Sequence, residues 1–189
     1  MKRVGIIAIQ GDVQAHARAC ERVGASVSKI LFERDLDDVD AIVIPGGEST
    51  TMAKGLTRLE LFEPLRERIR RGLPVLGTCA GAILLSERVE NHPVPVIGVL
   101  DATAMRNAYG TQVDSFASPV DDGCEREFDG MRCVFIRAPQ LGALGPQVKV
   151  LASVDSKPVF VQQRNVLAAT FHPELTGDVR VHEKLLALA

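Results

Sequence analysis

The chain has 189 residues, of which 46% are hydrophobic and 24% are charged, and its formal net charge is −2. This length and balance predict one globular domain over residues 1–189, with a core large enough to shape a cleft. A net charge near zero argues against a generally basic surface for nucleic acid, and no apolar run approaches the roughly 18–20 residues of a membrane span. We therefore expect a cytoplasmic protein with no nucleic-acid partner and no membrane association.

The four cysteines stand at positions 20, 79, 124 and 133 and form no C-x-x-C pair. Their spacing indicates neither a zinc site nor a disulfide framework, and the histidines are too scattered to complete a metal site. We expect no metal and no cofactor. Cys20 and Cys133 lie in helical and apolar patterns that predict core positions, whereas Cys124, in a polar turn, is predicted to be an exposed thiol.

The first part of the chain alternates strand and helix patterns. Residues 4–9 form a continuous apolar run, which is typical of a strand buried on both faces of a parallel sheet. Asp12 is a suitable N-cap for a helix over residues 13–23, and Gly24 is suited to end that helix. A second strand is expected at 26–32, after which an acidic stretch reads as a solvated connection.

Another buried strand, at residues 40–45, leads directly into Gly46 and Gly47. Glycines at the end of a strand permit close approach of backbone to a ligand, and Ser49 or Thr50 is expected to cap the helix that follows. Ligands of open α/β sheets bind outside the carboxyl ends of the strands, so this loop is a candidate binding element. A simple glycine turn before a capped helix would show the same pattern.

Cys79 lies between Gly77 and Gly81, where a buried strand is predicted to become an apolar helix. The spacing resembles the G-x-S-x-G elbow, in which a strained turn holds a nucleophile clear of the sheet. The N–H of Ala80 would then face the developing oxyanion, and the helix dipole would favour the thiolate over the thiol. A small buried cysteine in tight strand–helix packing is the alternative that this motif alone leaves open.

The elements on either side of this elbow differ in kind. Residues 51–71 are expected to be helical, with interruptions near Gly55 and Pro64 and a solvated, charged end. Beyond the elbow, short β-branched or alternating runs predict strands at 96–100, 112–116, 131–136, 149–154, 158–162 and 166–171, before a last helix at 179–188. The pattern predicts a three-layer α/β/α fold whose mostly parallel central sheet carries an antiparallel extension.

His172 and Glu174 form a second candidate for chemistry, at the end of the last strand-like run. Pro173 favours an extended backbone at His172, and residues two apart on an extended segment point the same way. A carboxylate on one imidazole nitrogen fixes the tautomer, so that the other nitrogen can take the proton of the Cys79 thiol. Alone, a His-x-Glu pair is more often structural, so this interpretation depends on Cys79.

Five motifs occur in order along the chain: GGESTT at 46–51, GTCAG at 77–81, RNAYG at 106–110, FIRAP at 135–139 and FHPELT at 171–176. Together they resemble the glutaminase subunits of pyridoxal 5′-phosphate synthase, which are small class I (triad-type) glutamine amidotransferases of flavodoxin-like architecture. The resemblance implies hydrolysis of L-glutamine to L-glutamate and ammonia. It also implies a synthase subunit as partner, which receives the ammonia and builds the vitamin B6 cofactor from a pentose phosphate and a triose phosphate.

The resemblance further implies roles for individual residues. Cys79 would be the nucleophile, His172 the general base and then acid, and Glu174 the residue that orients His172. The backbone amides of Gly47 and Ala80 would form the oxyanion hole. The glutamine-binding positions that it implies are Gly47, Glu48, Ser49, Arg106, Ile136 and Arg137, and an arginine suits an α-carboxylate because its planar fork bonds both oxygens.

Two other functions stay open at this point. One is a cysteine hydrolase of the same architecture that serves another pathway, and the other is a non-catalytic regulatory subunit on this fold. The chain also departs from the family pattern at 103–106 and 111–112, which lack the basic residues expected beside Arg106 and Gly110, and at 118–126, a region not matched to that pattern. These departures bear on partner contacts and local packing more than on the Cys, His and Glu positions.

Overall fold

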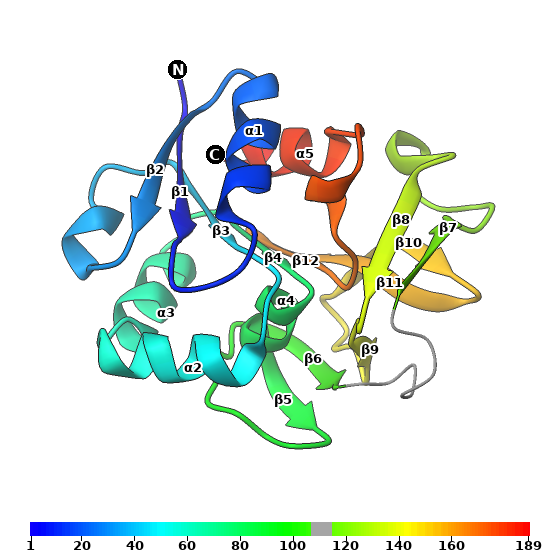
Figure 1. The fold of residues 1–189 in the computed structure, drawn as a ribbon. Helices are drawn as coiled ribbons and strands as arrows, with labels where there is room; N and C mark the ends of the chain where they lie inside the picture. The colour runs from blue at the N-terminus through cyan, green and yellow to red at the C-terminus, as the bar shows by residue number, and fades with distance from the viewer. Residues whose placement is uncertain (107–114) are drawn as a thin grey trace.

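The fold is taken from a computed structural model, and residues 1–106 and 115–189 are described. Its centre is a seven-stranded sheet (Figure 1). The strands in spatial order are β10 (Lys149–Val154), β11 (Lys157–Gln163), β12 (Val166–Ala169), β4 (Val75–Thr78), β3 (Ala41–Ile44), β1 (Arg3–Ile7) and β2 (Ser26–Ile30). The pairs from β12–β4 to β1–β2 are parallel, whereas β11 pairs antiparallel with both β10 and β12.

The parallel strands are buried because helices cover both faces. Every residue of β3, β4 and β12 is buried, which accounts for their unbroken apolar character. The register pairs Ile44 with Gly77 and Ala169 with Thr78. The carboxyl ends of these three strands therefore meet at one edge of the sheet, as the sequence predicted.

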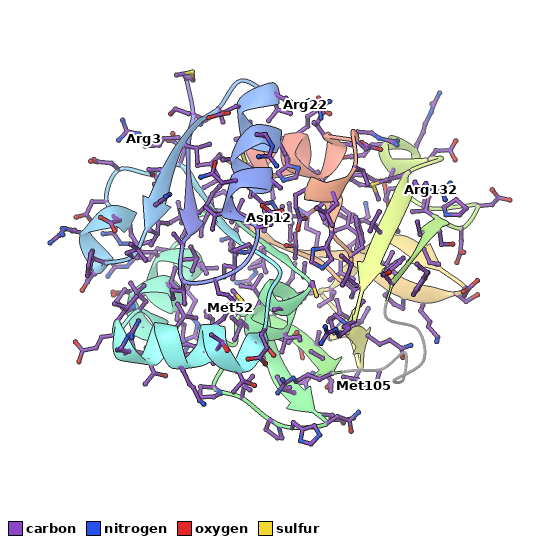
Figure 2. All side chains as sticks on the ribbon, viewed as in Figure 1. Arg3, Asp12, Arg22, Met52, Met105 and Arg132 are labelled. Atoms are coloured by element: carbon purple, nitrogen blue, oxygen red, sulfur yellow. The ribbon has the colours of Figure 1, made fainter. Side chains whose placement is uncertain are left out.

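Helices α1 (Val13–Arg22) and α5 (Arg180–Leu188) cover one face, and α2 (Ser49–Arg58), α3 (Phe62–Arg70) and α4 (Ala80–Leu85) cover the other (Figure 1). The predicted three-layer α/β/α fold is confirmed. Asp12 caps α1 as expected, because its Oδ1 accepts a hydrogen bond from the N–H of Ala15 at 2.9 Å (Figure 2). No helix within residues 1–106 and 115–189 is long and apolar enough to cross a membrane.

The predicted antiparallel extension is only partly right. It holds for β10 and β11, but β12 joins β4 in parallel. Two smaller sheets take up the other strands: β5 (Ser86–Glu90), β6 (Leu100–Met105) and β9 (Gln140–Gly142) form one, and β7 (Ser115–Pro119) and β8 (Arg132–Ile136) form the other. The part of the predicted 112–116 strand before Ser115 lies outside the described residues.

The strand expected at 96–100 begins only at Leu100. Arg66 explains the difference, because its guanidinium donates hydrogen bonds to the carbonyls of Val96, at 3.1 Å, and Ile97, at 2.6 Å. Those carbonyls are thus satisfied without a neighbouring strand. The charged end of the helical stretch, residues 66–71, was expected to be solvated, and these contacts correct that expectation for Arg66, whose side chain is half-buried.

The helical stretch after the glycine loop is interrupted at a different place than predicted. Helix α2 runs through Gly55 without a break and ends at Arg58. Glu60, with φ of 54°, turns the chain before α3 begins. Pro64 lies in the first turn of α3, where a missing N–H disrupts no intrahelical hydrogen bond. Short 3-10 helices at Glu33–Leu36, Arg126–Phe128 and Pro173–Leu175 complete the described elements.

Candidate active site

A pocket opens where the carboxyl ends of β3, β4 and β12 meet. Its volume of about 330 Å³ is at the small end of the range for small-molecule sites. The residues that line it are Gly47, Glu48, Ser49, Cys79, Ala80, Ile83, Arg106, Ile136, Arg137 and His172. Apart from Glu174, which lies behind His172, the pocket thus collects every predicted site residue, together with Ile83.

Cys79 occupies a strained turn between β4 and α4. Its backbone has φ of 47° and ψ of −103°, a conformation that residues with a side chain rarely adopt. Gly81 makes the turn possible, because a Cβ at this position would lie 2.1 Å from the carbonyl oxygen of Ile44. The thiol faces the pocket wall, with Sγ 3.8 Å from the carbonyl oxygen of Ile136.

His172 and Glu174 are joined by a hydrogen bond of 2.7 Å between Nδ1 and Oε1. The bond was predicted, but the extended backbone was not correct: the 3-10 helix at Pro173–Leu175 begins directly after His172. The backbone N–H of His172 donates to the carbonyl of Val134 on β8 at 2.8 Å. The turn is therefore anchored on β8.

The surroundings of His172 favour its charged form. Burial lowers the pKa of His172, but hydrogen bonds with Cys79 and Glu174 outweigh burial and raise it to about 10. For Glu174, burial has the largest effect and raises the pKa, but the hydrogen bond from His172 together with the other interactions with His16 and His172 outweighs burial and lowers it. An imidazolium between the Cys79 sulfur and an ionised carboxylate is the expected resting form.

Gly46 lies directly against both reactive side chains. A Cβ at this position would stand 2.4 Å from Cε1 of His172 and 3.3 Å from Cβ of Cys79. Such distances leave no room for a methyl group unless the imidazole moves. Gly46 therefore permits the close approach of the loop to the Cys79–His172 pair.

We expect the substitution Gly46→Ala to lower kcat/KM for a reaction at Cys79 by about a hundredfold. The reason is that an imidazole of His172 displaced by roughly 1 Å is no longer aligned with the Cys79 sulfur. Steady-state kinetics would measure this loss. Gly177→Ala is the matched control, since a Cβ at Gly177 meets no atom within 4 Å. Equal kinetics of the two variants would contradict the packing assigned to Gly46.

The N-cap of α2 differs from the prediction of Ser49 or Thr50. Glu48 caps the helix: its Oε1 accepts from the N–H of Thr50 at 3.0 Å and its Oε2 from the N–H of Thr51 at 2.7 Å. Burial raises the pKa of Glu48, but these hydrogen bonds, led by the one from the Thr51 hydroxyl, lower it to about 2. The pocket wall therefore carries an ionised carboxylate.

Two arginines were predicted to bind substrate, and both line the pocket. Arg106 donates to the carbonyl of His92 at 2.6 Å and to the hydroxyl of Thr50 at 3.1 Å, and its Nη2 lies 3.4 Å from Oε1 of Glu48. Arg137 has φ of 42°. The rest of the predicted RNAYG motif, residues 107–110, lies outside the described residues.

Sequence reasoning missed three residues near the site. The side chain of Gln10 accepts a hydrogen bond from the N–H of Glu48 at 3.0 Å and so holds the glycine loop. His16 and His182 received no role from the sequence, yet both are fully buried, and Nε2 of His16 lies 3.3 Å from Oε2 of Glu174. For the two histidines, a signal was available in the sequence: a polar residue on the apolar face of a helix indicates a buried polar contact.

The other cysteines do not line this pocket. Cys20 and Cys133 are core residues as predicted, and burial raises the pKa of each thiol to about 12. Cys124 is half-buried rather than exposed, because it packs against the core beneath α1 and α5. Within the described parts of the chain, no group of three His, Cys, Asp or Glu side chains is placed to hold a metal ion.

Comparison with known proteins gives the family. The model of the SNO glutamine amidotransferase family matches residues 6–187. The chain belongs to this family. It is 46% identical over 186 residues to the pyridoxal 5′-phosphate synthase subunit PdxT of Fervidobacterium nodosum, with 98% of this chain and 96% of the relative covered. The subunit of the same name from Carboxydothermus hydrogenoformans is 48% identical over 180 residues, with 95% and 94% covered.

A solved structure supports the SNO family assignment. The crystal structure of a glutamine amidotransferase superposes with a TM-score of 0.91 at 41% identity, covering 98% of this chain and 97% of that chain. An agreement of this extent includes the sheet edge that carries the pocket. The resemblance proposed from the five sequence motifs is therefore confirmed at the level of the family.

Proposed function

We propose that this chain is the glutaminase subunit of a pyridoxal 5′-phosphate synthase, formed by residues 1–189 as one domain in the cytosol. The observation that carries the proposal is the Cys79–His172–Glu174 arrangement beside a pocket lined by the predicted glutamine positions. The names of the two relatives at 46% and 48% identity support the same function.

In the first half of the proposed reaction, the Cys79 thiolate attacks the side-chain amide carbon of L-glutamine, and a C–S bond forms. The oxyanion is stabilised by the N–H groups of Gly47 and Ala80, each of which contributes about 2.7–4 kcal/mol in comparable sites. The imidazolium of His172 gives its Nε2 proton to the amide nitrogen, because its Nδ1 is engaged by Glu174. The C–N bond then breaks and ammonia departs, so that a thioester between Cys79 and the glutamyl group remains.

In the second half, a water molecule attacks the thioester carbon. Nε2 of His172, now neutral, takes a proton from this water, and the C–S bond breaks to release the thiolate. L-Glutamate leaves, and the imidazolium is restored. The net reaction converts glutamine and water to glutamate and ammonia, and no cofactor takes part.

The pocket wall suits the zwitterionic end of glutamine. Glu48 is ionised, and Arg106 and Arg137 bring positive charge to the same pocket. A guanidinium bonds an α-carboxylate through two parallel hydrogen bonds, and a carboxylate attracts an α-ammonium group. Ser49 and Ile136 complete the proposed contacts with the substrate.

The proposed partner is a synthase subunit that receives the ammonia sheltered from solvent. The test mixes the chain with such a subunit and follows glutamate release together with cofactor formation from a pentose phosphate and a triose phosphate. We expect both products from glutamine, with faster glutamate release when the partner is present. Cofactor formation from ammonium salt but not from glutamine, in a complex that assembles, would contradict the proposal.

A further inference from the structure

Two buried histidines lie behind the carboxylate of Glu174, and the mechanism above does not use them. His16 comes from α1 and His182 from α5, and neither is exposed to solvent. Nδ1 of His16 lies 3.0 Å from Nε2 of His182. Nε2 of His16 lies 3.1 Å from Oγ1 of Thr78 and 3.3 Å from Oε2 of Glu174.

Both rings are neutral in this environment. Burial lowers the pKa of His16, and burial followed by the neighbouring His16 lowers the pKa of His182 to about 3. A neutral imidazole has one N–H donor and one acceptor lone pair. The direction of the hydrogen bond between the two rings therefore determines what His16 offers to Glu174.

One direction leaves polar groups in conflict. If His16 carried its proton on Nδ1, its Nε2 lone pair would face the Glu174 carboxylate at 3.3 Å. His182 would then accept at Nε2 and carry its own proton on Nδ1. This nitrogen has no hydrogen-bond partner among the described residues. A buried N–H without an acceptor is among the rarest arrangements in proteins.

The opposite direction removes both conflicts. With its proton on Nε2, His16 donates to Thr78 Oγ1 and directs the same N–H toward Oε2 of Glu174, which has no hydrogen-bond partner among the described residues. His182 then donates from Nε2 to Nδ1 of His16. The group left over is a lone pair on His182, which costs less than an orphaned donor.

We propose that His182 and His16 form a directed hydrogen-bond chain and that His16 is a positioning residue for the proposed glutaminase, with its Nε2–H holding Oε2 of Glu174. Oε1 of the same carboxylate binds His172, and Thr78 immediately precedes Cys79. A single ring thus fixes both the nucleophile turn and the carboxylate that orients the base. The inference rests on the proposed function, but its first test does not.

The first test reads the tautomers directly. Long-range ¹⁵N–¹H correlation spectra of the full chain, without glutamine or partner, distinguish the three forms of each imidazole. The signals are assigned with the variants His16→Gln and His182→Gln. We expect both rings to be neutral with the proton on Nε2. A proton on Nδ1 of His16, or a charged His16 at neutral pH, would overturn the proposal whatever the chain catalyses.

The second test compares two replacements of His16 in the complex with the synthase subunit. Phenylalanine fills the space without a donor, whereas glutamine keeps one donor and one acceptor at similar positions. We expect His16→Phe to lower kcat/KM for glutamine by about tenfold to a hundredfold, the range for a lost hydrogen bond to a charged group, and His16→Gln to recover most of the loss.

The pH profile separates positioning from a merely structural role. The groups that face Glu174 are His172 from its own turn and His16 from α1, with Cys79 behind His172 and His182 behind His16. The charged groups that act on His16 are Glu174 first, then His172 and Asp12. Losing the His16 donor destabilises the carboxylate, so the acid limb of kcat/KM should move to higher pH. Equal activity of the two variants would overturn the proposal. So would a pH profile in which kcat/KM is lower at every pH but the acid limb stays at the same pH. If His16→Phe does not fold, the tautomer measurement decides.

Discussion

The substitution Cys79→Ala is expected to abolish glutamate release from glutamine, with a loss of at least about 10³-fold in kcat, because the reaction has no other nucleophile. Alanine keeps the Cβ at φ of 47°, so the strain of the turn is unchanged and the melting temperature should stay close to that of the wild type. Glutamate release in the presence of the synthase subunit measures the effect.

Two controls separate chemistry from assembly. Cys124→Ala removes a half-buried thiol outside the pocket and should leave turnover intact. The Cys79→Ala complex should still form cofactor when ammonium salt replaces glutamine.

A labelling experiment tests the same thiol. A glutamine-competitive electrophile should label Cys79 and spare Cys20 and Cys133, whose buried thiols have pKa values near 12. Glutamine hydrolysis that survives Cys79→Ala would rule out the mechanism, and absent labelling with the partner present would favour a non-catalytic subunit.

The substitution Glu174→Gln is expected to lower kcat by about 10⁴-fold, the loss seen when a triad carboxylate becomes an amide in serine proteases. The hydrogen bond from His172 to Glu174 helps to raise the pKa of His172 to about 10, so its loss lowers that pKa and weakens the imidazolium beside Cys79. The pH dependence of kcat/KM should therefore change, in addition to the fall in its maximum value.

The amide cannot satisfy both of its neighbours. If its oxygen accepts from His172, its NH₂ group faces the Nε2–H of His16 as one donor against another; if it is flipped, it imposes the wrong tautomer on His172. Glu183→Gln, on the exposed side of α5, is the matched control and should behave like the wild type. A Glu174→Gln enzyme within tenfold of wild-type kcat would show that the carboxylate does not orient the base.

The parts of the fold that were predicted correctly depend on local patterns. Continuous apolar runs identified β1, β3 and β4, and glycine spacing located the turn at Cys79. Pairing partners were harder, because the short apolar run Val166–Ala169 fits either strand direction, and only the tertiary structure places this strand beside β4. The segment at 96–99 has strand composition, but the side chain of Arg66 donates hydrogen bonds to the carbonyls of Val96 and Ile97, and no local pattern predicts that contact.

The candidate site shows the same division. Cys79, His172 and Glu174 were found because each stands in a motif with a chemical meaning. Gln10 and His16 were missed because their partners lie far along the chain: Gln10 contacts Glu48, 38 positions away, and His16 contacts His182, 166 positions away. Burial of a polar residue is a tertiary property, and a sequence shows only that such a residue falls on an apolar face.

The contact of Gln10 with the glycine loop also bears on how the protein acquires activity. A side chain from the loop after the first strand holds a backbone amide after the third, and a ring on the last helix supports a carboxylate through a ring on the first. The pocket therefore depends on contacts between residues 38 and 166 positions apart, and the entropic cost of forming a contact rises with the length of the loop that it closes. A chain that lacked α5 would have no His182 ring behind His16, so we expect its Glu174 carboxylate, and with it the His172 base, to be held less firmly.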